Sequence, residues 1–114
     1  MTALGTTKKK FVYLCEGNPG PKVMFALAHQ IIAFAGMTPA RKGRIDKYPY
    51  QGGGGKGYTL YQPLMESYLV ADVYSDLNQT EITLSTCKPE RINQAAMEIF
   101  MQRLIGPVLR SYAI

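Results

Sequence analysis

The sequence predicts an α+β domain in which one antiparallel sheet carries two helices on a single face. Runs of β-branched, aromatic and aliphatic residues lie near the start, the centre and the end of the chain. Two segments between them have apolar residues at helical spacing. The 114 residues are 46% hydrophobic and 18% charged, which suits one domain with its own core. We expect that domain to span residues 9–114 and residues 1–8 to be disordered.

The first half of the chain predicts a strand followed by a helix. Lys9–Glu16 is a strand with both faces covered, and the segment Gly17-Asn18-Pro19-Gly20 ends it. Pro21 suits the first turn of a helix, where its missing N–H costs nothing. That helix runs to about Ala35, and Gly36 follows as the glycine just past its end.

The second half predicts a hairpin, a helix and a last strand. Met65–Tyr74 and Glu81–Cys87 alternate and pair as antiparallel neighbours. Pro89 opens a helix that stops at Gly106-Pro107, and Val108–Ile114 is the last strand. The buried stripe of this helix is predicted to be Ile92, Ala95, Ala96, Ile99, Phe100 and Leu104. The order βαββαβ is that of a ferredoxin-like sandwich.

The strand Met65–Tyr74 has two unlike faces. The core face is predicted to carry Met65, Ser67, Leu69, Ala71 and Val73. The other face is predicted to carry Glu66, Tyr68, Val70, Asp72 and Tyr74. Two carboxylates and two phenols are costly to bury unless they line a site or an interface. Because one layer of helices leaves this face open, oligomerisation is the usual cover in so short a chain.

Charge and cysteine content restrict the class of protein. The net charge of +5 could attract nucleic acid or a small anion, or be no more than solvated lysines. Cys15 and Cys87 both lie in apolar segments, and we expect buried free thiols in a reducing compartment. The apolar stretch Val23–Met37 is interrupted by His29 and Gln30 and is too short to span a bilayer. We therefore expect a cytoplasmic protein and no membrane partner.

Residues 47–62 are predicted to form a glycine-rich loop. Four consecutive glycines, Gly52 to Gly55, allow a ligand to approach the backbone closely, although such a stretch also suits a flexible surface loop. Glycines, a lysine, phenols and a carboxylate together suit a small ligand with an aromatic base, hydroxyls and mixed charge. The candidate site residues are Gly54, Gly55, Lys56, Gly57, Tyr58, Tyr61, Glu66 and Tyr68.

Several kinds of site are excluded by the residues present. One histidine and two dispersed cysteines do not supply the ligands of a zinc site, so no metal is expected. A nucleophile activated by histidine would have to use His29, in the middle of a helix. The Gly55-Lys56 pair lacks the Ser or Thr that a phosphate-binding P-loop requires. Glu81–Cys87 has no aromatic residue for stacking RNA bases, so a nucleic-acid partner is not expected.

The segment Gly57-Tyr58-Thr59-Leu60-Tyr61, followed by strand, helix and strand, resembles the T-loop region of PII (GlnB-like) signalling proteins. Those proteins are trimeric ferredoxin-like domains that bind nucleotides between subunits. This resemblance implies an adenine-nucleotide-binding protein that acts on a partner without turnover.

Three further features occur together: the tyrosine-rich segment leading into Glu66, the sequence Thr86-Cys87-Lys88, and Asn93 and Ala96 in the following helix. In these features the chain resembles the phage S-adenosylmethionine (SAM) lyases, or SAMases, formerly called SAM hydrolases. This resemblance covers about the last two thirds of the chain and implies a GlnB-like homotrimer with active sites at subunit interfaces. For a phage-encoded chain it also implies an anti-restriction role in the host bacterial cytoplasm.

The reaction of that family needs neither a metal ion nor a histidine base, which agrees with the residues present. The carboxylate of SAM attacks its own γ-carbon, which yields 5′-methylthioadenosine and L-homoserine lactone without metal or cofactor. The resemblance implies Glu66 as the polar anchor and Tyr58 as its partner near the sulfonium or ribose, with Lys56 and the glycine N–H groups holding the carboxylate or ribose. Glu66 could instead be a solvated carboxylate, and Tyr58 a packing residue at a subunit interface.

Glu66-Ser67 also resembles the self-cleavage site of bacterial SAM decarboxylases, which generates a pyruvoyl group. The histidines that follow it in that family are replaced here by Tyr68 and Leu69. Without them neither self-processing nor protonation has its acid, so we rank this reading below the other two.

Overall fold

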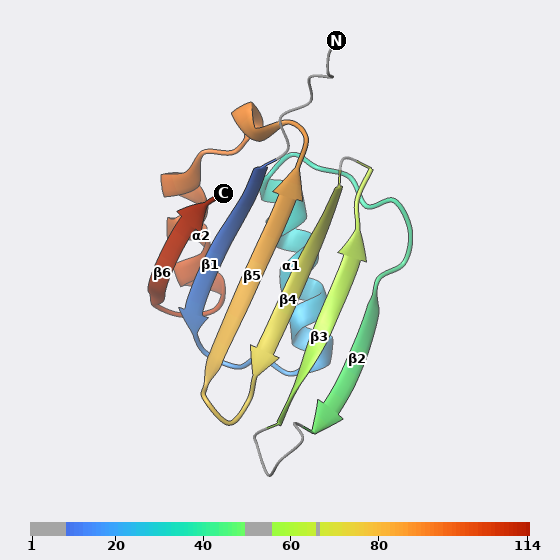
Figure 1. The fold of residues 1–114 in the computed structure, drawn as a ribbon, viewed down its shortest axis with the longest axis vertical. Coiled ribbons are helices and arrows are strands. Elements are labelled where there is room, and N and C mark those ends of the chain that lie inside the picture. Colours follow the sequence, from blue (N-terminus) through green and yellow to red (C-terminus); the bar gives the residue numbers. More distant parts are fainter. Residues whose placement is uncertain (1–8, 50–55, 66) are drawn as a thin grey trace.

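The computed structural model describes residues 9–49, 56–65 and 67–114 (Figure 1). Its elements are β1 (Lys9–Glu16), α1 (Pro21–Phe34), β2 (Arg44–Pro49), β3 (Lys56–Pro63), β4 (Ser67–Tyr74), β5 (Gln79–Thr86), the short 3-10 helix η1 (Pro89–Arg91), α2 (Gln94–Leu104) and β6 (Val108–Ala113). The strands form one six-stranded sheet in the order β2-β3-β4-β5-β1-β6, with every neighbouring pair antiparallel.

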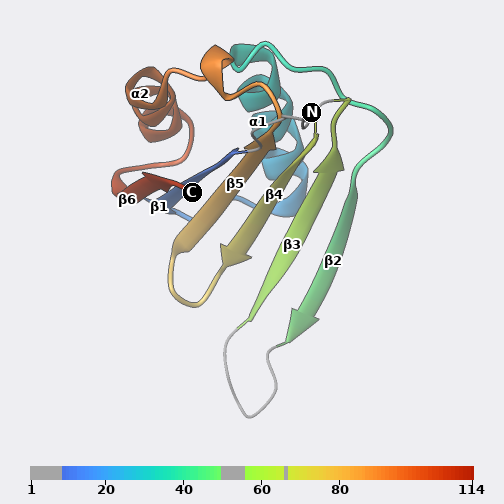
Figure 2. The same ribbon diagram turned by 45° about the horizontal axis from the view of Figure 1, so that its top comes forward.

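Both helices lie against the same face of the sheet, as Figures 1 and 2 show. The core lies between these two layers, because every second strand residue points towards the helices. Leu69 and Leu84 face each other in this core, and Met24 and Ile31 of α1 are fully buried in the same cluster. The predicted α+β class with two helices on one face is confirmed.

The ferredoxin-like order βαββαβ is made by β1, α1, β4, β5, α2 and β6. β1 lies between β5 and β6, and β5 lies between β1 and β4. The start of β1 pairs with the residue after β6, since Lys10 N donates to Ile114 O at 2.8 Å and Ile114 N donates to Lys10 O at 2.9 Å. Gly36 has φ +71°, as expected of the glycine that follows α1.

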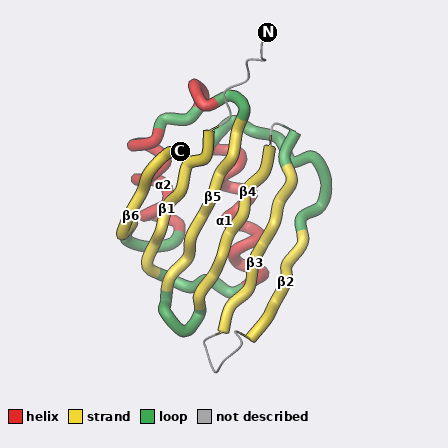
Figure 3. Tube along the Cα trace, viewed as in Figure 1, coloured by secondary structure: helices red, strands yellow, loops and turns green. Residues whose placement is uncertain are grey.

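The glycine-rich loop predicted at 47–62 is shorter than expected, because both of its ends are strands. Residues 47–49 belong to β2 and residues 56–62 to β3, which pairs with β4 from Gly57 opposite Tyr74 to Pro63 opposite Tyr68 (Figure 3). Residues 50–55 lie outside the described part. The strand β3 escaped prediction because a buried polar residue, Gln62, interrupts its apolar alternation.

The second helix begins later than predicted. Pro89 opens the 3-10 turn η1, and α2 begins after Asn93, whose side-chain oxygen accepts a hydrogen bond from Ala96 N at 3.0 Å. The buried side chains of α2 are Met97 and Met101, whereas Ile99 and Ala95 of the predicted stripe are exposed. Ile92, Phe100 and Leu104 of that stripe are partly buried against the core.

The start of β4 also differs from the prediction. Met65 was expected on the core face but is 70% exposed. Leu64 N donates to Ser67 O at 2.9 Å, and the strand β4 begins at Ser67 rather than at Met65. Leu69, Ala71 and Val73 of the predicted core face are fully buried.

Both cysteines are free thiols, as expected. Cys15 is buried opposite Thr80, at one end of the β1–β5 pair. Cys87 directly follows Thr86, which pairs with Lys9 at the other end, and it is half-buried rather than buried. None of the described helices is long and apolar enough to cross a membrane.

Candidate functional site

The predicted site residues that the structure describes lie at two ends of the sheet. Tyr61 and Tyr68 are near the end where β3 leads to β4, whereas Lys56 and Gly57 begin β3 at the other end. A strand rises about 3.3 Å per residue, so about 17 Å of strand separate Lys56 from Tyr61. Gly54, Gly55 and Glu66 lie outside the described residues. Within this chain, therefore, the described candidates do not form one compact site.

Tyr61 and Tyr68 form an aromatic pair on the sheet face directed away from α1 and α2, which we call the outer face. Their ring centroids are 6.1 Å apart and the rings are tilted by 34°. Arg44 is opposite Tyr61 in the β2–β3 register, and its guanidinium carbon lies 5.9 Å from the centre of that ring. Tyr61 is 37% exposed. The pair therefore offers accessible aromatic surface for stacking or for a cation.

A basic hollow adjoins this pair at the β2 edge of the sheet. It has a volume of about 270 Å³ and is lined by Arg41, Lys42, Arg44, Tyr61 and Pro63. Arg44 Nε lies 3.5 Å from Asp46 Oδ2 in an ion pair whose side chains are 75% and 62% exposed. Exposed pairs of this kind contribute at most about 1 kcal/mol. Positive charge consequently dominates this end of β2.

The backbone of the basic turn is held against β3 by a buried amide. Gln62 is 1% exposed, and its Nε2 donates to Arg41 O at 2.7 Å and to Pro63 O at 2.9 Å. Gly43 fits closely beside it: a Cβ at this position would meet Gln62 Oε1 at 2.6 Å and Tyr61 O at 2.8 Å. The cations of the turn thus project from a backbone that is fixed on the sheet.

An acidic row lies further along the outer face. Asp72 of β4 is directly opposite Glu81 of β5, and Thr59 Oγ1 donates to Asp72 Oδ1 at 2.6 Å. Like charges opposite each other on a sheet are unfavourable unless a cation or a donor compensates them. This row lies two residues from the Tyr61 row, or about 7 Å along the strand. It could attract the ammonium group of a small ligand.

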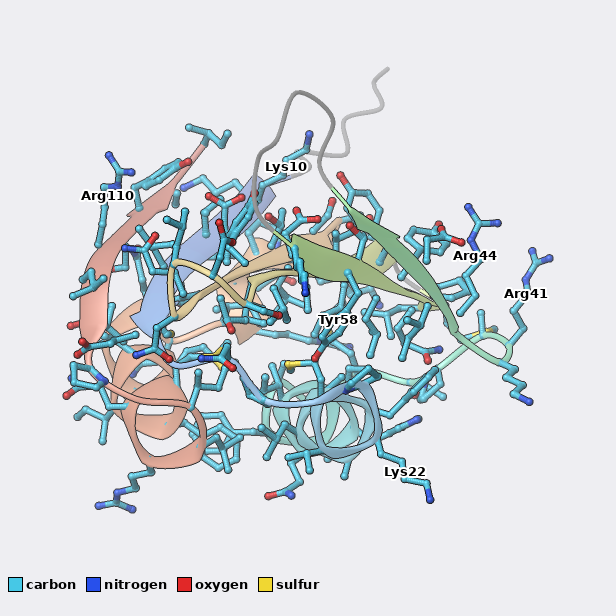
Figure 4. The ribbon with its side chains drawn as sticks, turned by 90° about the horizontal axis from the view of Figure 1, so that it is seen from below. Lys10, Lys22, Arg41, Arg44, Tyr58 and Arg110 are labelled. Carbon is cyan, nitrogen blue, oxygen red and sulfur yellow. The ribbon has the colours of Figure 1, made fainter. Side chains whose placement is uncertain are left out.

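Tyr58 lies on the other side of the sheet from Tyr61 and Tyr68. It is 5% exposed within the core, and its hydroxyl donates to Pro19 O at 2.5 Å, in the loop before α1. Figure 4 shows its ring between the sheet and the helix layer. Burial raises the pKa of Tyr58 to about 12, so the phenol is uncharged at neutral pH. In this chain Tyr58 is a packing residue.

Sequence reasoning missed the contribution of Arg44 and the Thr59–Asp72 contact. Arg44 was visible as part of a basic stretch, but its place over Tyr61 requires the β2–β3 register. A strand assignment for Lys56–Pro63 would have placed Thr59 and Tyr61 on one face and Tyr58 on the other. Among residues 9–49, 56–65 and 67–114, no cluster of three or more His, Cys, Asp or Glu side chains could hold a metal ion.

Comparison with known proteins gives a likeness of fold. No family model matches the sequence, and no curated protein matches it. Among solved structures, the crystal structure of the adenosylmethionine decarboxylase from Aquifex aeolicus VF5 is similar over 96% of this chain and 88% of that chain, with a TM-score of 0.64 and 15% sequence identity. At this identity the likeness establishes the α+β, ferredoxin-like sandwich.

Proposed function

We propose that this protein acts on SAM as a lyase, forming 5′-methylthioadenosine and L-homoserine lactone. The observation that carries the proposal is the Tyr61–Tyr68 pair on the outer face, and Glu66 precedes Tyr68 by two residues in the sequence. Two further points support a SAM-related function. The sequence resembles the phage SAM lyases, and the fold is shared with a protein described as an adenosylmethionine decarboxylase over 96% of this chain.

The chemistry of SAM suits an aromatic pair. Its sulfonium is a compact cation without N–H donors, so it gains more from the face of a phenol ring than from a hydrogen-bond acceptor. Such cation–π contacts contribute about 0.5–2 kcal/mol. The adenine can stack on the second ring of the Tyr61–Tyr68 pair. The acidic row at Asp72 and Glu81 would attract the ammonium group of the methionine part.

The reaction requires no proton transfer and no water. A carboxylate oxygen of SAM forms a bond to the γ-carbon, the bond from that carbon to sulfur breaks, and its electron pair remains on sulfur as a neutral thioether. One positive and one negative charge disappear in this step. The protein therefore has to hold the methionine part folded for attack and keep water away from the reacting charges. We propose Glu66 as the anchor that holds this conformation.

Tyr58 does not join the reacting groups in our proposal. Its burial on the helix side places it away from the outer face of its own subunit, so Tyr61 and Tyr68 take the position beside the sulfonium. We propose a homotrimer in which the end of β3 that carries Lys56 and Gly57, with Gly54 and Gly55, completes the site of a neighbouring subunit. In this arrangement Lys56 and Gly57 of one subunit would lie near Tyr61 and Tyr68 of its neighbour.

The test is incubation of the purified protein with SAM and chromatography of the products. We expect 5′-methylthioadenosine, with homoserine lactone appearing before homoserine. Tyr61→Ala should lower kcat/KM at least tenfold. Tyr112→Ala is the matched control and should stay within twofold, because Tyr112 is 40% exposed on the outer face at the opposite edge of the sheet. Glu66→Gln should abolish turnover, while Glu90→Gln should not.

Three results would overturn the proposal. Adenine nucleotide bound and returned unchanged, with SAM left intact, would identify a PII-like binding module. Carbon dioxide release from SAM would identify a decarboxylase. An equal loss of activity in Tyr61→Ala and Tyr112→Ala would remove the tyrosine pair from the mechanism.

A further inference from the structure

We infer that the hollow lined by Arg41, Lys42, Arg44, Tyr61 and Pro63 binds a phosphate-type dianion carried by a small phosphomonoester. SAM carries no phosphate, so the inference goes beyond SAM cleavage and does not rest on it. It rests on the charge of the hollow, the fixed backbone beneath it and its size.

The charge of the hollow favours a dianion. Three cations occur within the four residues 41–44, and Asp46 forms an ion pair with one of them, Arg44. That pair engages the Nε of Arg44 at 3.5 Å. An arginine has five N–H donors, so most of the donor capacity of this side chain is left for a ligand. Guanidinium groups match the geometry of phosphate oxygens in two parallel hydrogen bonds.

The turn is arranged before any ligand arrives. Gln62, buried on the helix side of β3, holds the carbonyl of Arg41, and Gly43 lies against Tyr61 O and Gln62. In addition, the Arg44 guanidinium rests over the Tyr61 ring. A fixed backbone lowers the cost of ordering cationic side chains around an anion. Figure 4 shows Arg41 and Arg44 extending at the same edge of the molecule, beyond β2.

Size and neighbouring charge favour a small ligand over a nucleic acid. A volume of about 270 Å³ is close to the lower end of the 300–1,000 Å³ typical of small-molecule pockets. A polyanion that crossed the outer face from this hollow would meet the carboxylates of Asp72 and Glu81. The three cations of the turn lie together at the β2 edge, where a single phosphate group fits, whereas the other labelled cations on this side of the sheet, Lys10 and Arg110, lie on β1 and β6 beyond the carboxylates.

The experiment measures binding without SAM. The probes are AMP, adenosine and inorganic phosphate, followed by calorimetry and by amide shifts in nuclear magnetic resonance. We expect AMP to bind at least tenfold more tightly than adenosine, and inorganic phosphate to displace it. The largest shifts should fall at residues 41–44 and 61–63. Raising the salt concentration should weaken AMP binding.

A charge-matched pair of variants tests the position of the site. The double variant Arg41→Gln with Lys42→Gln should weaken AMP binding at least tenfold. The control, Lys22→Gln with Arg103→Gln, removes the same charge from the two helices and should change it less than twofold; Figure 4 shows Lys22 on the helix side. The inference would be overturned if both double variants lost AMP affinity equally, or if AMP and adenosine bound with equal affinity. It would also be overturned if a single-stranded oligonucleotide bound more tightly per phosphate than AMP.

Discussion

Two tyrosines three residues apart in β3 have opposite environments. Tyr58 points towards the helices and donates to Pro19 O, whereas Tyr61 lies on the outer face beneath Arg44. Since side chains alternate along a strand, an odd spacing puts the two residues on different faces. Their chemistry differs accordingly: one phenol packs the core, and the other is accessible to a ligand.

Replacing Tyr58 by Phe removes one buried hydrogen bond and keeps the ring. The free energy of unfolding should fall by about 1 kcal/mol in urea denaturation, which is the usual net value of such a bond. Turnover of SAM should remain within twofold of the unmodified protein. If Tyr58→Phe abolished turnover at unchanged stability, the hydroxyl of Tyr58 would have a role in the reaction.

The same substitution should change the response to alkaline pH. Burial raises the pKa of Tyr58 from 10.0 to about 12, so between these values the folded state holds a proton that the unfolded chain has lost. The contribution of this group to stability is complete below pH 10 and is lost as the pH rises through 12. The slope of unfolding free energy against pH over this window should therefore be smaller in Tyr58→Phe.

The β2–β3 hairpin is the element that turns the ferredoxin-like sheet into a candidate binding surface. It adds two strands beside β4 and brings Arg44 over Tyr61. The turn that leads into β2 depends on Gly43. This glycine has no room for a side chain, because Gln62, Tyr61 and Phe25 surround it. The β2–β3 hairpin is thus joined to the rest of the fold by the packing around Gly43 as well as by the pairing of β3 with β4.

Gly43→Ala should destabilise the protein by about 1–3 kcal/mol, the usual cost of overpacking a filled site. Gly20→Ala is the control, because a Cβ there meets nothing within 4 Å; Gly20 is the N-cap of α1, where Ala is less favourable than Gly, so its effect should be at most about 1 kcal/mol and smaller than that of Gly43→Ala. Urea denaturation measures both. Equal effects would show that the contacts around Gly43 relax without cost.

Sequence patterns predicted the elements whose apolar residues alternate or recur without interruption. β1, α1, β4, β5 and β6 were found for this reason. β3 was missed because Gln62 occupies a core position, and its partners, Arg41 O and Pro63 O, become visible when the chain is folded. Tyr61 and Tyr68 were proposed as site residues and do lie together, but the placement of Arg44 depends on strand register, which the sequence does not state.

At the scale of the whole molecule, the fold is similar to that of a protein described as an adenosylmethionine decarboxylase, whereas the sequence has Tyr68 and Leu69 where the family with the Glu-Ser self-cleavage site has histidines. His29 is exposed on α1, on the helix side of the sheet. Ser67 Oγ lies 2.8 Å from Ser85 Oγ, and Tyr68 and Leu69 follow it in β4. We therefore expect the Glu66–Ser67 bond to remain intact.

Mass spectrometry of the purified protein should accordingly show one chain of 12.7 kDa and no fragments. Ser67→Ala serves as the reference, since it cannot rearrange at this bond and should give the same pattern. Two fragments in the unmodified protein, the second with a blocked pyruvoyl end, would place the chain among self-processing proteins.

The paired hydrogen bonds between Lys10 and Ile114 also hold the start of β1 next to the end of β6. A short peptide could join these two positions, and the chain could be opened instead at the turn Ser75–Asn78 between β4 and β5. Such a circular permutant would keep the strand order while moving the ends to the opposite side of the molecule. Fusion partners could then be attached there, away from the tyrosine pair and the basic hollow.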